Sequence, residues 1–77
     1  MDELLAGIRQ AIKSERKAQE HYQELAEKSG DPKAKSMFEQ MRRDEAEHEQ
    51  ILKARYEALK NIQDNQNHQD QQNHQNE

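Results

Sequence analysis

The 77-residue chain contains no cysteine, no tryptophan, one proline and two glycines. Without cysteine it can form neither disulfides nor the thiolate sites of structural zinc and iron–sulfur centres. No apolar run approaches ~18 residues, so the sequence predicts no membrane span. A chain this short buries little apolar surface and usually needs a metal ion or a partner subunit for stability. We therefore expect metal ligation by Glu and His, oligomerisation, or both.

The chain has fewer basic than acidic residues, 12 against 16, and its formal net charge is therefore −4 at pH 7. Nucleic-acid binding needs a basic surface, so we expect no nucleic-acid partner. The first three residues, Met1-Asp2-Glu3, are acidic where a signal peptide is basic, and a cytoplasmic location is therefore expected. Charged residues make up 36% of the chain and apolar residues 30%. This mixture favours an all-α protein of long solvated helices with narrow buried stripes.

The first half of the chain has the pattern of an amphipathic helix over about residues 3–28. Apolar or small residues recur at steps of three and four, which places them on one helical face. They are Leu4, Leu5, Ile8, Ala11, Ile12, Ala18, Tyr22, Leu25 and Ala26. Glu15 interrupts this stripe, so its carboxylate is expected to point into it.

The segment Ser29-Gly30-Asp31-Pro32 predicts a turn over residues 29–31. Gly30 suits the left-handed conformation just past a helix end, Asp31 suits the cap of the next helix, and Pro32 suits its first turn. So short a connection folds the two helices into an antiparallel hairpin.

A second helix is expected over about residues 32–62. Glu45 and His48, three residues apart and on one face, interrupt its stripe at consecutive positions. The stripe comprises Ala34, Phe38, Met41, Glu45, His48, Leu52, Arg55, Leu59 and Ile62, widened by Met37, Ile51 and Ala58. Residues 63–77 lack apolar side chains and repeat a six-residue Gln/Asn/His-rich unit. This tail, outside the 1–62 hairpin, is expected to be disordered or a frayed helix.

The polar interruptions fall in one layer of such a hairpin. Glu15 and Glu45 are each fifteen residues from Gly30, so both lie roughly 22 Å from the turn at ~1.5 Å per residue. By the same count His48 lies opposite Ile12. Buried carboxylates and imidazoles need a ligand or a hydrogen-bond network. Carboxylate-rich ligation with one imidazole per metal suits iron or manganese, with zinc as a further substitute.

A single hairpin leaves its stripe exposed, so we expect it to dimerise into a four-helix bundle. Two copies each of Glu15, Glu45 and His48 would then surround two metal ions, which is the ligand set of carboxylate di-iron bundles. Tyr22 and Gln19 are candidates for hydrogen bonds to these ligands. For Tyr22, simple packing in the bundle core is the alternative.

Other ionisable residues have simpler explanations. A solvated face is the expected place of Glu20, His21, Glu24, Glu47 and Glu49. For Glu49 the alternative is a role in guiding iron inward. His68 and His74 could bind metal weakly, or the tail could serve only solubility. Because the chain has eleven Glu, an isolated Glu-x-x-His is unspecific, and the metal prediction depends on three residues meeting in one layer.

Over about residues 4–59 the sequence resembles the rubrerythrin-type ferritin-like superfamily. Residues 14–22 (SERKAQEHY) with 25–27 (LAE) are similar to the first-helix motif of that group, and 45–48 (EAEH) is similar to its second-helix metal motif. Residues 31–38 fit the stretch between the motifs. The resemblance implies three metal ligands: Glu15, Glu45 and His48.

Most rubrerythrins carry both bundle halves in one chain and add a cysteine-rich rubredoxin domain, whereas this sequence has one half and no cysteine. It is in this respect similar to encapsulated ferritin-like proteins, two-helix chains whose di-iron site forms between subunits. Those proteins are ferroxidases that assemble as rings of dimers inside a protein nanocompartment. The resemblance therefore implies a homodimer or ring of dimers and an encapsulin-type shell, although residues 63–77 lack the apolar residues of a shell-targeting segment.

We therefore predict an enzyme, a ferroxidase that oxidises Fe(II) to Fe(III) with dioxygen or peroxide for iron storage or detoxification. One alternative is a rubrerythrin-like peroxide reductase, which needs an external reductant protein. Another is a non-catalytic helical interaction module, either stapled by metal or metal-free. The iron content of the purified protein separates the last alternative from the other two.

Overall fold

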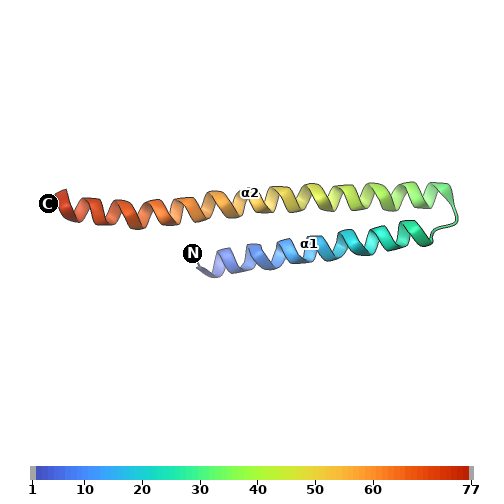
Figure 1. The fold of residues 1–77 in the computed structure, drawn as a ribbon, viewed down its shortest axis with the longest axis horizontal. Helices are drawn as coiled ribbons and strands as arrows, with labels where there is room; N and C mark the ends of the chain where they lie inside the picture. Colours follow the sequence, from blue (N-terminus) through green and yellow to red (C-terminus); the bar gives the residue numbers. More distant parts are fainter. Residues whose placement is uncertain (1, 77) are drawn as a thin grey trace.

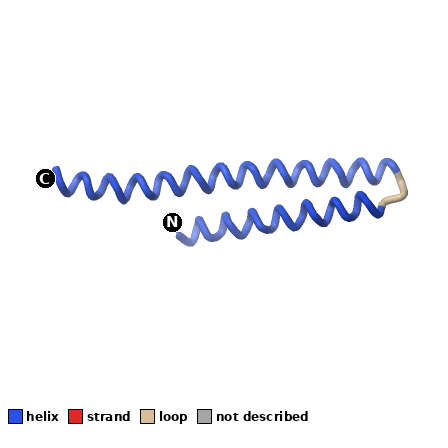
Figure 2. The backbone as a smooth tube through the Cα atoms, in the orientation of Figure 1, coloured by secondary structure: helices blue, strands red, loops and turns tan. Residues whose placement is uncertain are grey.

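The chain folds into two long antiparallel helices (Figure 1). The computed structural model describes the backbone of residues 2–76 and the side chains of residues 2–65. Helix α1 spans Asp2–Lys28 and helix α2 spans Pro32–Asn76. Both described elements are helices joined by one short connection, so the predicted all-α hairpin is confirmed (Figure 2). The molecule is a rod of 70 × 16 × 11 Å.

The connection depends on a side-chain cap and needs no left-handed glycine. The Asp31 carboxylate accepts a hydrogen bond from the Ala34 amide at 3.0 Å, which is the predicted helix cap. The prediction of a left-handed Gly30 is wrong, since no described residue has a positive φ. The Ser29 amide instead donates to the Ala26 carbonyl at 3.3 Å and closes the end of α1.

Side-chain hydrogen bonds between the helices recur at intervals of seven residues along both of them. Three pairs form this series, here called the polar ladder: Gln63 with Asp2 at 3.0 Å, Arg9 with Tyr56 at 3.0 Å, and Arg16 with Glu49 at 2.8 Å. Seven residues are about two helical turns, so the pairs follow one side of the hairpin. The ladder holds the two helices in a single register.

Little of the hairpin is buried. Among the residues with described side chains, only Leu5, Ala26 and Glu49 are buried. Four large apolar side chains stay about half exposed: Leu4 (52%), Met37 (53%), Ile51 (54%) and Ile62 (46%). The last three share one face of α2 by helical spacing, and we call this face the open face. The expected stripe of α2 is therefore only partly turned toward α1.

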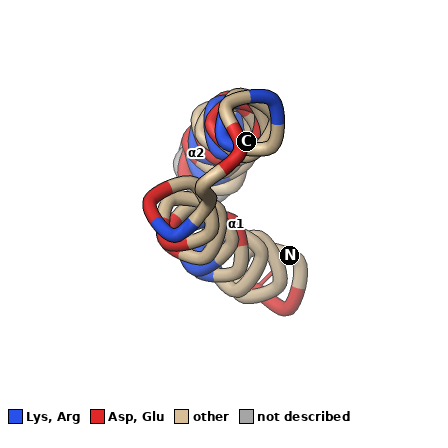
Figure 3. Tube along the Cα trace, turned by 90° about the vertical axis from the view of Figure 1, so that its right-hand side faces the viewer, with Lys and Arg blue, Asp and Glu red and all other residues tan. Residues whose placement is uncertain are grey.

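Charged residues of both signs lie on both helices (Figure 3). In the part of the chain that the structure describes, neither helix combines the length and the apolar composition that crossing a membrane requires.

Beyond the pairing of Asp2 with Gln63, α2 continues to Asn76 without a partner helix (Figure 1). The expected helix end was near residue 62. Residues 63–76 contain neither glycine nor proline, so no residue in this segment breaks the helix. The side chains of His68 and His74 lie outside the described residues, and weak metal binding by them stays a prediction.

Replacing Gly30 with alanine is expected to stabilise the hairpin by about 0.4–1 kcal/mol. The backbone at Gly30 has no positive φ, and an added Cβ would meet no atom within 4 Å. The substitution therefore acts mainly by reducing the freedom of the unfolded chain. Denaturant unfolding of both proteins measures the change. Asp31→Ala is a control of opposite sign, because it removes the cap and costs about 1 kcal/mol. Lower stability of Gly30→Ala would contradict the turn described above.

Candidate metal centre

Three side chains that could ligate a metal meet midway along the paired helices. They are Glu15 of α1 with Glu45 and His48 of α2, and we call them the ligand group. One potential ligand atom of each residue lies within 4.8 Å of the other two. The Nδ1 atom of His48 is 3.7 Å from Glu15 Oε2 and 3.6 Å from Glu45 Oε2. The structure thus brings together the three residues that the sequence placed in one layer.

Helix geometry accounts for this meeting. Glu45 and His48 share a face because they are three residues apart. Side chains lean toward the N-terminus of their own helix, so those of α1 lean away from the turn and those of α2 lean toward it. His48, which starts farther from the turn than Glu45, therefore reaches Glu15. A count of backbone heights alone had placed His48 opposite Ile12.

The ligand group fits a cation. Separations of 3.6 and 3.7 Å are too long for hydrogen bonds, but are of the order found between atoms that each bind one metal at about 2.0–2.2 Å. The Oε2 atom of Glu15 is buried and has no hydrogen-bond partner among the described residues. A buried carboxylate oxygen without a partner is costly, and a bound cation would satisfy it. Two carboxylates and one imidazole are donors that iron, manganese and zinc accept.

The ligand group borders the open face of α2. The side chain of His48 is 55% exposed, whereas those of Glu15 and Glu45 are each 23% exposed. His48 is eleven residues from Met37 and three from Ile51, spacings that keep all three on neighbouring parts of one helical face. A partner that covers the open face would therefore also cover the ligand group.

Glu49 is the residue whose place the sequence prediction missed. It was expected on a solvated face, but it is buried, with 7% of its surface exposed. Its Oε2 atom accepts hydrogen bonds from Arg16 Nε and Lys53 Nζ, both at 2.8 Å, and its Oε1 atom accepts one from Gln19 Nε2 at 2.6 Å. The available signal was its position four residues after Glu45, on the same inward face. With both oxygens engaged, Glu49 does not offer the free carboxylate that guiding iron requires.

Tyr22 is not joined to the ligand group. Its side chain is half-buried, and its ring centroid lies 5.9 Å from that of His21, which is exposed. In the described part of the chain, no hydrogen bond reaches the Tyr22 hydroxyl. Gln19 donates to Glu49 and not to Glu15. Neither side chain therefore makes the expected hydrogen bond to a ligand within this hairpin.

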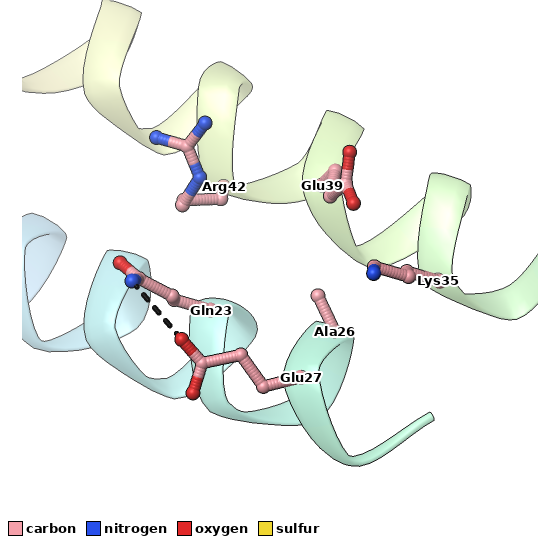
Figure 4. Close-up of a pocket in the computed structure, with 6 residues that line it drawn as sticks. All are labelled: Gln23, Ala26, Glu27, Lys35, Glu39 and Arg42. Atoms are coloured by element: carbon pink, nitrogen blue, oxygen red, sulfur yellow. Dashed lines mark hydrogen bonds between the residues drawn. The ribbon is translucent and has the colours of Figure 1, made fainter. Parts of the chain in front are cut away.

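A groove between the helices near the turn is separate from the ligand group (Figure 4). It is lined by Gln23, Ala26, Glu27, Lys35, Glu39 and Arg42. Two carboxylates and two cations stand around it, and the Gln23 amide donates to Glu27 at 3.3 Å. Gln23 and Arg42 continue the seven-residue spacing of the polar ladder and face each other across the groove (Figure 4). The groove presents no concentration of one charge for a ligand.

Glu49 gives the metal-free hairpin a specific dependence on pH. The hydrogen bonds from Lys53, Arg16 and Gln19, in that order of effect, lower the pKa of Glu49 from 4.5 to about 2. Because the pKa is depressed in the folded state, the stabilisation is fully present above about pH 4.5 and is lost as pH falls toward 2.

Thermal unfolding in the presence of chelator is therefore expected to show a Tm gap between the wild type and Glu49→Gln that narrows from about pH 6 to about pH 3. The comparison with Glu49→Gln subtracts the carboxylates that titrate in both proteins. A gap that stays constant over this range would contradict the ion network around Glu49.

Comparison with known proteins identifies a family. The family model described as rubrerythrin matches residues 6–76, which include nearly all of both helices and the whole ligand group. Neither the curated proteins nor the solved structures contain a match to the chain.

Proposed function

The chain belongs to the rubrerythrin family, whose members are ferritin-like and iron-binding, and on this premise we propose that it is a ferroxidase with a di-iron site shared between two copies. The observation that carries the proposal is the ligand group, in which a buried oxygen of Glu15 has no partner beside Glu45 and His48. Residues that could hold iron are thus present within the family match.

The need for a second copy follows from the number of ligands. One ligand group offers two carboxylates and one imidazole, which are too few for two metal ions. A two-fold partner would supply four carboxylates and two imidazoles in total, the set used by di-iron bundles. The open face supports this arrangement, because Met37 and Ile51 are about half exposed beside His48. Pairing two open faces would bury these apolar side chains and bring the two ligand groups together.

Charge balance is met by two divalent cations, and Fe(II) is the one that we propose as the substrate. Two carboxylates per copy give four negative charges in a dimer, which match the four positive charges of two Fe(II) ions. Glu15 and Glu45 can each bind through one or both oxygens, and His48 presents Nδ1 toward both of them. Glu49 keeps its own charge neutralised by Arg16 and Lys53, so it does not compete for the ions.

The proposed reaction balances without any further centre. Each of two Fe(II) ions loses one electron, and dioxygen takes up the two electrons with two protons to give hydrogen peroxide. When hydrogen peroxide is the oxidant, the same two electrons and two protons give two water molecules. Because the electrons come from Fe(II), the reaction needs no thiolate electron-transfer site, and these 77 residues contain no cysteine. A peroxide reductase would instead draw electrons from an external protein.

A non-catalytic role rests on one specific observation. Protonated His48 would pair with both carboxylates at 3.6 and 3.7 Å without any metal. The large exposure of His48 weakens such pairs, since solvent screens them. If these ion pairs took the place of a metal ion, the protein would bind no iron and would act as a helical interaction module. A ring of dimers and an encapsulin-type shell belong to the proposal through the family resemblance alone.

Aerobic addition of Fe(II) to the metal-free protein is expected to produce ferric absorbance faster than in a buffer blank. Glu15→Ala and His48→Ala should each lower the rate to that of the blank while helical content by circular dichroism is retained, because each removes a ligand from a partly exposed site. Glu47→Ala is the matched control: it removes an exposed carboxylate next to the ligand group and should keep the rate. A wild-type rate equal to the blank would contradict the ferroxidase proposal.

Placing a carboxylate on the open face is expected to separate the dimer. Ile51→Glu would put an unpaired charge into the proposed interface, where desolvation is costly. Analytical ultracentrifugation should show a dimer for the wild type and a monomer for Ile51→Glu. Gln50→Glu introduces the same charge at an adjacent exposed position away from the open face and should remain dimeric. An Ile51→Glu protein that stays dimeric would exclude this face as the interface.

A further inference from the structure

We propose that Glu49 is a positioning residue, which fixes the height and rotation at which Glu15 of α1 meets Glu45 and His48 of α2. The inference rests on the proposed metal site, since it concerns the geometry of that site. Glu49 does not bind the metal in this proposal. Its side chain instead sets the position of α1 relative to α2.

Sequence adjacency connects Glu49 directly to the ligand group. Glu49 follows His48 in α2, and Arg16 follows Glu15 in α1. The bond between Arg16 Nε and Glu49 Oε2, 2.8 Å long, therefore joins the residues that stand next to a ligand on each helix. A slide of α1 against α2 that separates Glu15 from His48 also moves Arg16 relative to Glu49 and so disturbs this bond.

Several hydrogen bonds restrict the position of Glu49 between the two helices. Gln19 and Arg16 reach it from α1 and occupy different oxygens, at 2.6 and 2.8 Å, while Lys53 holds it from its own helix. Apolar contacts are non-directional and tolerate sliding, whereas hydrogen bonds weaken steeply with distance and angle.

Within the described residues, the other two pairs of the polar ladder are solvent-exposed, and water can replace their hydrogen bonds. The contacts of Arg16 and Gln19 with Glu49 are partly buried. The register of the ligand group therefore depends chiefly on Glu49.

Substitution by leucine separates positioning from stability. Glu49→Leu keeps a side chain in the buried space, and Arg16 and Lys53, with 58% and 39% exposed side chains, can turn to solvent. Replacing a buried ion network by an apolar residue is often neutral or stabilising. A purely structural role for Glu49 would thus leave a folded protein with unchanged metal binding.

The experiment is a Co(II) titration of the purified protein, followed by visible absorption, together with thermal unfolding of the metal-free protein. We expect Glu49→Leu to unfold at or above the wild-type temperature, to bind Co(II) about tenfold more weakly and to show an altered Co(II) spectrum. Glu49→Gln can still accept from Arg16 and exchange a hydrogen bond with Gln19, so it should recover most of the affinity. Tyr56→Phe removes an exposed ladder bond and should bind like the wild type.

The outcomes distinguish this inference from the proposed function. Wild-type affinity and spectrum in Glu49→Leu would overturn the positioning role. A wild type that binds no Co(II), or binding that survives Glu15→Ala, would overturn the metal site itself. If Glu49→Leu loses its helical content, Glu49→Asp decides in the same way. It keeps the charge but shortens the reach by one methylene, and unchanged Co(II) affinity and spectrum in that variant would overturn the proposal.

Discussion

Burying a carboxylate oxygen without a hydrogen-bond partner is energetically costly, and the proposed metal site depends on this cost. Glu15 Oε2 is in this situation, although it lies beside a second carboxylate and an imidazole. Glu49 is also buried, but both of its carboxylate oxygens accept hydrogen bonds, from Arg16 and from Gln19. The hairpin itself therefore satisfies Glu49 with hydrogen bonds but does not satisfy Glu15. A bound cation would satisfy Glu15.

Hydrogen-bonded side chains and exposed apolar side chains occupy different parts of the hairpin surface. On one side of the hairpin a polar ladder closes the contact between the helices, and its members need nothing further. Half-exposed apolar side chains of α2 lie on its open face, which borders the ligand group at His48. We propose that a second copy covers the open face. The di-iron site would then form where the open faces of two copies meet.

The two helices and the members of the ligand group could be predicted from the periodicity of the sequence. The three-and-four spacing predicted both helices, and the interruptions at Glu15, Glu45 and His48 identified the ligand group. The remainder depends on side-chain direction and competition for partners, which spacing does not encode. Glu49 was grouped with other glutamates on a solvated face, yet Arg16 and Gln19 of α1 donate to it and it is buried. Gly30 looked like a left-handed helix end, but the Ser29 amide closes the end of α1 by donating to the Ala26 carbonyl, and Gly30 has no positive φ.

Anaerobic titration with Fe(II), followed by native mass spectrometry, reports the metal content and the subunit number of the protein together. For a di-iron site shared between two copies, we expect a dimer, or a multiple of dimers, that takes up two iron ions per pair of chains. A monomer that binds iron at full occupancy, or a dimer that binds none, would contradict this proposal.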